Sequence, residues 1–311
     1  MITRVCVLTL FVSLLLSSPS RAQWIQGPDF PNASSGREHA AGLTYQGSVL
    51  ALGGSPFTQN LDGRVDIWPE GGSAWSAGPI LEGTIVGQGA GEDSMGRIIL
   101  FGGRALIGDD VGKAYVWDLV QGKQGNIASR GASAPEIGFA WATDSAGGVY
   151  SIGGGPGATA TPSDPNSAYL ERYEATMDAW VPLTSLPEAL ADAAAAANGA
   201  GHVFVIGGYP ALGGAPTSKA YRYDIASDTW SDLAVADLPV PLAGARAAFG
   251  ADGRLYVVGG RDSLGTLATT WVWEAASDTW TAGPAMSLPR ESFALTLGPD
   301  DHLWAMGGAG T

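Results

Sequence analysis

The chain contains a single cysteine, Cys6, among its 311 residues. Because Cys6 lies in an apolar stretch near the N-terminus, the rest of the chain has no disulfide, no thiolate metal ligand and no cysteine nucleophile. Basic residues are also few, since 16 Lys and Arg oppose 30 Asp and Glu and give a formal net charge of −14. This shortage of positive charge argues against nucleic acid and anionic membrane surfaces as partners, because both require a basic footprint.

Charged residues make up only 15 % of the chain and hydrophobic residues 45 %, so a sizeable core is available and disorder is excluded as the dominant state. Glycine is abundant instead, with 46 residues and no collagen-like period, which indicates many turns and close backbone contacts. No Ser-His-Asp order, P-loop or metal-ligand spacing is present. The sequence therefore predicts neither a cofactor nor a bound metal.

The first 22 residues have the three parts of a secretory signal peptide. Arg4 supplies a positive start, residues 5–16 are apolar, and small residues stand three and one positions before Gln23. A transmembrane anchor is the alternative, but spanning a bilayer needs roughly 20 apolar residues. We therefore expect residues 1–22 to be removed, leaving a secreted or periplasmic chain of residues 23–311 with no membrane insertion.

Six Gly-Gly pairs divide the expected mature chain into repeats. Each pair ends a short apolar run, and successive pairs are 49, 51, 54, 52 and 48 residues apart. The pairs occupy residues 53–54, 102–103, 153–154, 207–208, 259–260 and 307–308. A second apolar run precedes each of these runs across a turn signal such as Asn198-Gly199 or Asp252-Gly253, which predicts β-hairpins.

The second half of each repeat is aromatic. A variable polar loop leads to an aromatic-acidic strand such as Arg222-Tyr223-Asp224, and a tryptophan then closes the unit, as at Trp75 and Trp180. The run Ala226–Trp230 recurs letter for letter fifty residues later. Four short strands per unit, repeated at this period, predict sheets stacked face to face as the blades of a propeller.

Both ends of the chain contribute to the last predicted blade. Trp24 begins a segment that matches those at Trp75 and Trp280, so it is expected to be a fourth strand whose first two partners lie near the C-terminus. The chain stops at Thr311, before any aromatic-acidic third strand. The sequence therefore predicts an all-β, six-bladed ring closed by the N-terminal strand, with an incomplete sixth blade because the product is truncated.

The Gly-Gly, Tyr-Asp and Trp landmarks resemble those of kelch repeats, and the resemblance runs from Trp24 to the end of the chain. It implies a kelch-type β-propeller of the superfamily that includes the galactose-oxidase propeller. The second repeat departs from the pattern, since Gly125-Asn126-Ile127 stands near the expected closing tryptophan. The arginine that commonly precedes the first strand in this family is matched only by Arg37 and Arg290.

The resemblance places ligand binding at one end of the propeller channel, on loops between blades and after the Gly-Gly pairs. Candidates at the expected channel mouth are Arg37, Glu38, His39, Arg246, Arg290 and Glu291, and candidates in loops are Arg104, Asp109, Arg261 and Asp262. Convergent Arg and Glu side chains can hold a polar ligand, with Arg forking onto a carboxylate. In the alternative interpretation the two arginines before first strands bridge adjacent blades, the histidine is structural, and the loops are solvated connections.

Three functions of different classes are compatible with these features. The favoured one is an exported, non-catalytic scaffold that recognises a glycan or a protein through loops at the channel end. The resemblance also implies, as an alternative, a sugar mutarotase or epimerase of the sialic-acid type, although the net charge opposes an anionic sugar. A copper-radical oxidase of the galactose-oxidase type is disfavoured, because it needs a cysteine crosslinked to a tyrosine and the expected mature chain has no cysteine.

Overall fold

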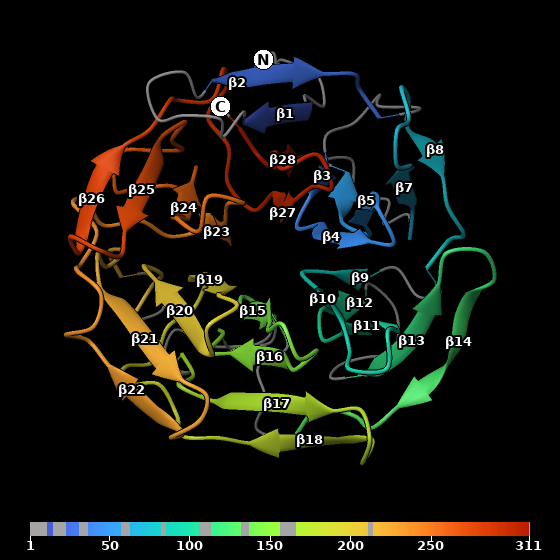
Figure 1. Cartoon of the computed structure of the whole chain (residues 1–311), viewed down its shortest axis with the longest axis horizontal. Coiled ribbons are helices and arrows are strands. Elements are labelled where there is room, and N and C mark those ends of the chain that lie inside the picture. The colour runs from blue at the N-terminus through green and yellow to red at the C-terminus, as the bar shows by residue number, and fades with distance from the viewer. Residues whose placement is uncertain are drawn as a thin grey trace, which may run out of the picture.

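The computed structural model describes residues 11–14, 23–30, 37–56, 63–81, 85–105, 113–131, 137–155, 166–210 and 214–310. Within these ranges every regular element is a β-strand. No helix of the described chain is long and apolar enough to cross a membrane. The strands form sheets arranged around a central axis, which confirms the predicted all-β propeller (Figure 1).

Five antiparallel sheets of the described chain are each built from consecutive strands, and we number these blades in chain order. The first blade contains β4 (Ala41–Tyr45), β5 (Ser48–Leu52), β7 (Val65–Trp68) and β8 (Ser76–Ala77), and the second β10 (Gly89–Glu92), β11 (Ile98–Phe101), β13 (Ala114–Asp118) and β14 (Gly122–Ile127). The third contains β15 (Ala140–Thr143), β16 (Val149–Ile152), β17 (Leu170–Glu174) and β18 (Ala179–Pro182). The fourth contains β19 (Ala194–Ala197), β20 (His202–Ile206), β21 (Ala220–Asp224) and β22 (Thr229–Ser231), and the fifth β23 (Arg246–Phe249), β24 (Leu255–Val258), β25 (Thr270–Glu274) and β26 (Thr279–Ala282).

A further sheet takes its strands from both ends of the chain, in the order β2-β1-β28-β27 (Figure 1). The predicted first and second strands are β27 (Ala294–Leu297) and β28 (Leu303–Met306), and β2 (Trp24–Gly27) is the outermost strand. Between β28 and β2 lies β1 (Phe11–Leu14), which is antiparallel to both.

This terminal sheet corrects two expectations. The sequence predicts a sixth blade without a third strand. In the structure β1, which belongs to the expected signal peptide, occupies that position, because the free edge of β28 can pair with an extended segment. The described chain thus contains five blades of consecutive strands rather than six. Closure of the ring by the N-terminal strand stays a prediction.

The second strand of each sheet is the most deeply buried element. Four consecutive residues of β5, β11, β16, β20, β24 and β28 are buried. Each apolar run can therefore pack against the neighbouring sheets on both of its faces. The first glycine of every Gly-Gly pair then turns the chain in a left-handed conformation, with φ between 59° and 71°.

Closing tryptophans join neighbouring blades through one repeated hydrogen bond. The indole Nε1 donates to a backbone carbonyl of the preceding linker in the pairs Trp180–Ala128 (3.0 Å), Trp230–Thr184 (2.8 Å) and Trp280–Ala236 (2.7 Å). Trp24 donates in the same way to Pro284 O at 2.9 Å and to Thr270 Oγ1 at 3.0 Å. These bonds attach β2 to the fifth blade.

Among the described residues, the second blade lacks this tryptophan bond. It also lacks a second interaction between blades, in which an aspartate accepts hydrogen bonds from an aromatic side chain of its own blade and from the preceding linker. In the fifth blade, the left-handed Asp278 (φ 50°) accepts hydrogen bonds from Trp273 Nε1 (2.9 Å) and from the backbone N–H of Ala236 (2.7 Å). In the second blade, Gly122 has the left-handed conformation (φ 77°). The indole N–H of the buried Trp117 has no acceptor among the described residues.

We expect Gly122→Asp to stabilise the protein by about 1 kcal/mol, because it supplies that missing acceptor. A Cβ at Gly122 would lie 3.9 Å from Trp117 Nε1 and 3.3 Å from Pro79 Cβ, which must shift slightly, and aspartate already adopts this conformation at equivalent positions. Urea unfolding measures the change. Gly253→Asp is the control, because Gly253 has a similar φ of 76° with no atom within 4 Å and should only destabilise. Equal effects of the two substitutions would contradict the claim that the new carboxylate supplies the missing acceptor for the Trp117 indole.

Candidate functional site

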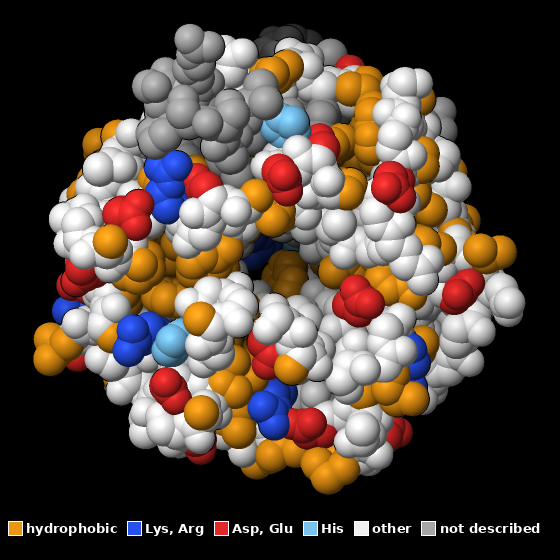
Figure 2. All heavy atoms as spheres, in the orientation of Figure 1, with side chains coloured by type: hydrophobic (Ala, Val, Ile, Leu, Met, Phe, Trp, Pro, Cys, Tyr) orange, Lys and Arg blue, Asp and Glu red, His pale blue; other side chains and the backbone are white. Residues whose placement is uncertain are grey.

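A residue in the left-handed conformation precedes the first strand of every repeat. These residues are His39 (φ 58°), Gly87 (74°), Gly138 (65°), Asp192 (52°), Gly244 (65°) and Ser292 (53°). Backbone N–H to carbonyl bonds connect them in the pairs 39 to 292 (2.6 Å), 292 to 244 (3.0 Å), 244 to 192 (2.8 Å), 192 to 138 (2.7 Å) and 87 to 39 (3.3 Å). We call these six residues the belt, and Figure 2 shows a hollow at the centre of the ring.

Three belt positions carry a side chain although glycine suits their conformation best. The left-handed conformation costs a residue with a side chain about 1–2 kcal/mol. Gly87, Gly138 and Gly244 show that the belt backbone requires no side chain there. His39 and Ser292 therefore lower stability at the channel end, which is the pattern of residues retained for a function, whereas aspartate at position 192 tolerates the conformation better.

All three of these side chains line a single hollow of about 250 Å³, which we call the channel recess. Its other lining residues are Glu38, Tyr209, Gly244, Arg261, Glu291 and Ala309. They come from segments before first strands and from loops after the Gly-Gly pairs. Both kinds of segment lie at the same end of the blades, as predicted for a binding site.

Three carboxyl groups crowd the channel recess, and burial raises the pKa of each. Repulsion from Glu291 further raises the pKa of Glu38, whereas Arg246 and Arg261 partly offset the rise at Asp192. Arg261 also lowers the pKa of Glu291, from which its Nη1 atom lies 3.4 Å away, while Asp192 raises it. The recess is therefore acidic and only partly neutralised.

His39 is neutral at pH 7. Burial and the nearby positive charge of Arg246 lower the pKa of its imidazole to about 4. Its Nδ1 atom lies 3.8 Å from Glu38 Oε2, which is too far for a hydrogen bond. The imidazole can therefore offer one N–H donor and one acceptor to a ligand.

We expect His39 to make the protein less stable as the pH falls from about 6.5 towards 4. The unfolded chain binds a proton near the ordinary pKa of 6.5, whereas the folded protein does so only near 4, so protonation favours unfolding in this window. The measurement is the urea midpoint between pH 7 and 4 for the native chain and for His39→Asn, since asparagine tolerates the left-handed conformation. The same pH dependence in both proteins would contradict the shifted pKa.

Arg246 is placed at the start of β23, on the channel side of the fifth blade (Figure 1). Its Nε donates to Phe293 O at 2.8 Å, and its guanidinium lies 4.7 Å from the ring centroid of Trp141. Burial lowers its pKa to about 10, and Asp192 opposes this shift. The equivalent residues in the other repeats are Ala41, Gly89, Ala140, Ala194 and Ala294. The arginine thus adds a charge beside Asp192 that the repeat does not require.

Arg37 and Arg290 lie outside the lining of the recess and are buried. Arg37 pairs with Asp66 and donates through Nε to Gly53 O at 3.0 Å. Arg290 donates to Gly307 O at 2.8 Å, and burial lowers its pKa to about 10. The backbone carbonyl of each accepts from a glycine N–H of the adjacent repeat. The side chains of both arginines are therefore engaged within their own repeats, and only their backbone carbonyls link adjacent repeats.

The loop candidates have different environments. Arg261 lines the recess, but Asp262 accepts the backbone N–H groups of Leu264 (2.7 Å) and Gly265 (3.0 Å) and shapes its own loop. Arg104 belongs to β12 (Arg104–Ala105), which pairs with β9 (Ile85–Val86), just as β3 (Arg37–Glu38) pairs with β6 (Ser55–Pro56). Asp109 lies outside the described residues.

Sequence reasoning missed Asp192 as a lining residue, whereas Tyr209 and Ser292 belong to segments it considered, the loop after the fourth Gly-Gly pair and the triplet before the last first strand. Asp192 and Ser292 stand at the same repeat position as His39, directly before a first strand. An alignment of the repeats on that strand, rather than on the Gly-Gly pairs alone, would have shown three side chains where the other repeats have glycine. Nothing in the sequence marks Tyr209 in this way.

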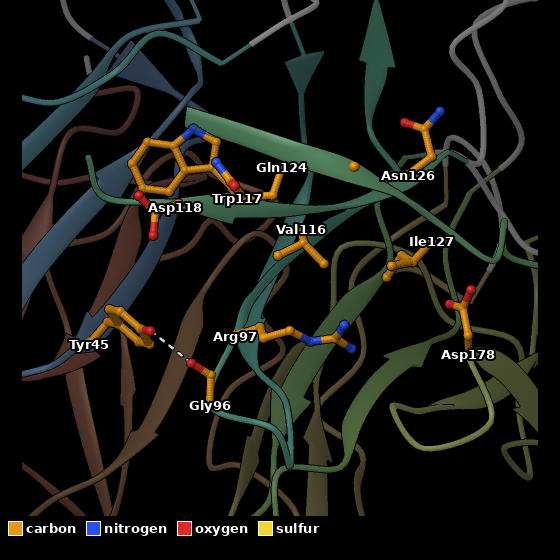
Figure 3. Close-up of a pocket in the computed structure, with 11 residues that line it drawn as sticks. Tyr45, Gly96, Arg97, Val116, Trp117, Asp118, Gln124, Asn126, Ile127 and Asp178 are labelled. Carbon is orange, nitrogen blue, oxygen red and sulfur yellow. Dashed lines mark hydrogen bonds between the residues drawn. The ribbon is translucent and has the colours of Figure 1, made fainter. Parts of the chain in front are cut away.

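A larger hollow of about 620 Å³ lies at the second blade (Figure 3). Three of its polar side chains already have partners, since Tyr45 OH donates to Gly96 O (2.7 Å), Arg97 Nε to Asp93 (2.8 Å), and Asp178 accepts from Tyr173 OH (2.8 Å), whereas the indole N–H of Trp117 has no acceptor among the described residues. The bulge in β14 and the missing closing tryptophan account for its size. We therefore place the candidate site in the channel recess.

No group of three or more His, Cys, Asp or Glu side chains is placed to hold a metal ion in the part of the chain that the structure describes. The recess combines neutral, acidic and basic groups without such a cluster.

The fold and the recess define a β-propeller with a polar site at one end of its channel. The Kelch motif family matches residues 193–234 and 246–287, which confirms the kelch repeats. The structure of YjhT has the same fold, with a TM-score of 0.69 over 88 % of this chain and 91 % of that chain, at 13 % identity.

Two curated relatives come from Mus musculus. The chain is 32 % identical to Kelch domain-containing protein 7A over 134 residues, which are 42 % of this chain and 16 % of that protein. It is 31 % identical to Kelch-like protein 35 over 140 residues, which are 45 % and 22 %. Kelch-like protein terF of Aspergillus terreus is 32 % identical over 117 residues, or 34 % and 24 %. The chain thus spans less than a quarter of these relatives.

Proposed function

We propose that this protein is a non-catalytic binding scaffold that recognises a partner, in the first place a protein, through the channel recess. The observation that carries the proposal is the belt, where His39, Asp192 and Ser292 occupy positions suited to glycine and all line the same hollow. The kelch motifs support a protein-binding role. A glycan is the second class of ligand, because carboxylates and arginines also bind hydroxyl groups.

Peptide and glycan arrays probed with the full chain test this proposal. We expect ligands that bind the native chain and are lost with Glu38→Gln combined with Asp192→Asn, which keep the side-chain shapes but remove two charges. Asp262→Asn is the matched control, because it removes a charge from a loop outside the recess lining. Ligands that bind all three proteins equally would contradict a role for the recess.

We further propose that the chain is exported and that Trp24 closes the propeller ring. The hydrogen bond from Trp24 to Pro284 O supports closure, because it repeats the inter-blade bond of the other closing tryptophans. The bond from His39 N to Ser292 O supports it at the inner side of the ring. Intact-mass measurement of secreted material tests export, and a product that retains Cys6 would contradict removal of the leader.

A sugar mutarotase is the second candidate function. Neutral His39 lies near carboxyl groups of raised pKa, and such groups can exchange protons with a sugar near neutral pH. Exchange between the anomers of N-acetylneuraminic acid, followed by NMR, separates the two functions. The scaffold proposal expects the uncatalysed rate with the native chain, and acceleration that His39→Asn abolishes would favour the enzyme.

A further inference from the structure

The arginines near the channel recess are partly engaged within the protein. Arg261 Nη1 lies 3.4 Å from Glu291 Oε1, and the Arg261 side chain is 47 % exposed. Arg246 donates its Nε hydrogen to Phe293 O and lies over the Trp141 ring. An anionic ligand that bound Arg261 would compete with Glu291 for it.

Two carboxylates of the recess keep their hydrogen-bonding capacity. No hydrogen bond from the described residues reaches the carboxylate of Asp192, which lies in the field of Arg246 and Arg261. Among the described residues no hydrogen bond reaches the carboxylate of Glu38, which lies 3.8 Å from Nδ1 of the neutral His39 and whose side chain is 27 % exposed. Three carboxyl groups and one arginine line the recess, so a ligand that brings hydrogen-bond donors and positive charge complements them.

Resting on the proposed function, we propose that the channel recess binds a cationic nitrogen group, the guanidinium or ammonium end of a basic side chain on a protein partner. Such a group carries several N–H donors and no acceptor, which complements Glu38 and Asp192. Its charge also relieves the repulsion among the three carboxylates of the recess. The net charge of −14 on the chain favours the approach of a basic partner.

The size of the recess agrees with this occupant. A hollow of about 250 Å³ is smaller than the usual pockets for drug-sized ligands and accommodates the end of one side chain. An anionic group would enter beside three carboxylates and would compete with Glu291 for Arg261. The geometry therefore selects a cation over an anion.

Probes that differ in charge but hardly in shape test the inference. We expect Nα-acetyl-arginine amide to bind the full chain at least tenfold more tightly than Nα-acetyl-citrulline amide, its neutral isostere, in an NMR titration. Asp192→Asn should weaken the arginine probe at least fivefold, and the control Asp262→Asn should change its affinity less than twofold. Preserved thermal melting of both variants confirms that they fold.

Equal affinity for the two probes, or undiminished binding by Asp192→Asn, would overturn the inference. So would the absence of any shift with the arginine probe at millimolar concentration. A different result would contradict the proposed function, namely that no array ligand depends on the recess residues for binding. An array ligand that depends on the recess but carries no basic group would overturn the cationic class while supporting the proposed function.

Discussion

Replacement of Glu171 by alanine should lower the free energy of unfolding by about 3–5 kcal/mol, because it leaves a buried charge without its counter-ion. Glu171 Oε1 lies 2.7 Å from Arg130 Nε, and both side chains are at most 1 % exposed. The guanidinium of Arg130 also lies 4.3 Å from the Phe139 ring centroid, so it cannot turn to solvent without disrupting that packing. Urea denaturation at pH 7 measures the loss.

Lys219→Ala is the matched control for this experiment. Lys219 Nζ lies 3.0 Å from Asp237 Oδ2, but the two side chains are 46 % and 39 % exposed. Solvent screens such a pair, so its removal should change the free energy of unfolding far less than the loss of the buried pair. Similar losses for Glu171→Ala and Lys219→Ala would contradict the structural role assigned to the buried pair.

Gly207→Ala is the second substitution with a large expected effect, of about 2–5 kcal/mol. Alanine at φ 67° is strained, and its Cβ would lie 2.3 Å from the backbone oxygen of Leu242 in the linker to the next blade. Neither atom can move without opening the contact between the two blades. The loss should appear in urea unfolding as a lower midpoint.

Gly253→Ala measures the cost of the left-handed conformation without a steric clash. Gly253 has a similar φ of 76°, but a Cβ there would meet no atom within 4 Å. This substitution should lower the free energy of unfolding only by the cost of the left-handed conformation, which is about 1–2 kcal/mol. If both glycine variants lost the same stability, close approach between blades would not explain the Gly-Gly pairs.

The repeated landmarks made most of the fold predictable. A Gly-Gly pair, an aromatic-acidic strand and a closing tryptophan are local patterns, and their recurrence alone implies units that stack on one another. The third strand of the terminal sheet was not predictable, because residues 11–14 have the composition of a signal peptide and their pairing with β28 depends on an edge that only the folded ring presents. The indole donor left free on Trp117 likewise depends on packing between blades.

The candidate site was predictable in part. Glu38, His39, Arg261 and Glu291 were predicted from their repeat positions and do line the recess. Asp192 was missed because it stands within an alanine-rich run, and its importance follows from a backbone conformation that the sequence does not display. Arg37 and Arg290 were candidates because arginine can bind ligands, but their burial engages them with backbone carbonyls.

The most direct test of the belt as a functional feature is the double variant His39→Gly with Asp192→Gly, which gives two positions the residue already present at Gly87, Gly138 and Gly244. The measurement is thermal melting together with binding of the array ligands. If the side chains are retained for binding, the variant should melt at the same or a higher temperature, because left-handed strain is relieved, and it should lose its ligands. A variant that melts markedly lower and still binds would show that the side chains serve the fold, and would contradict the account.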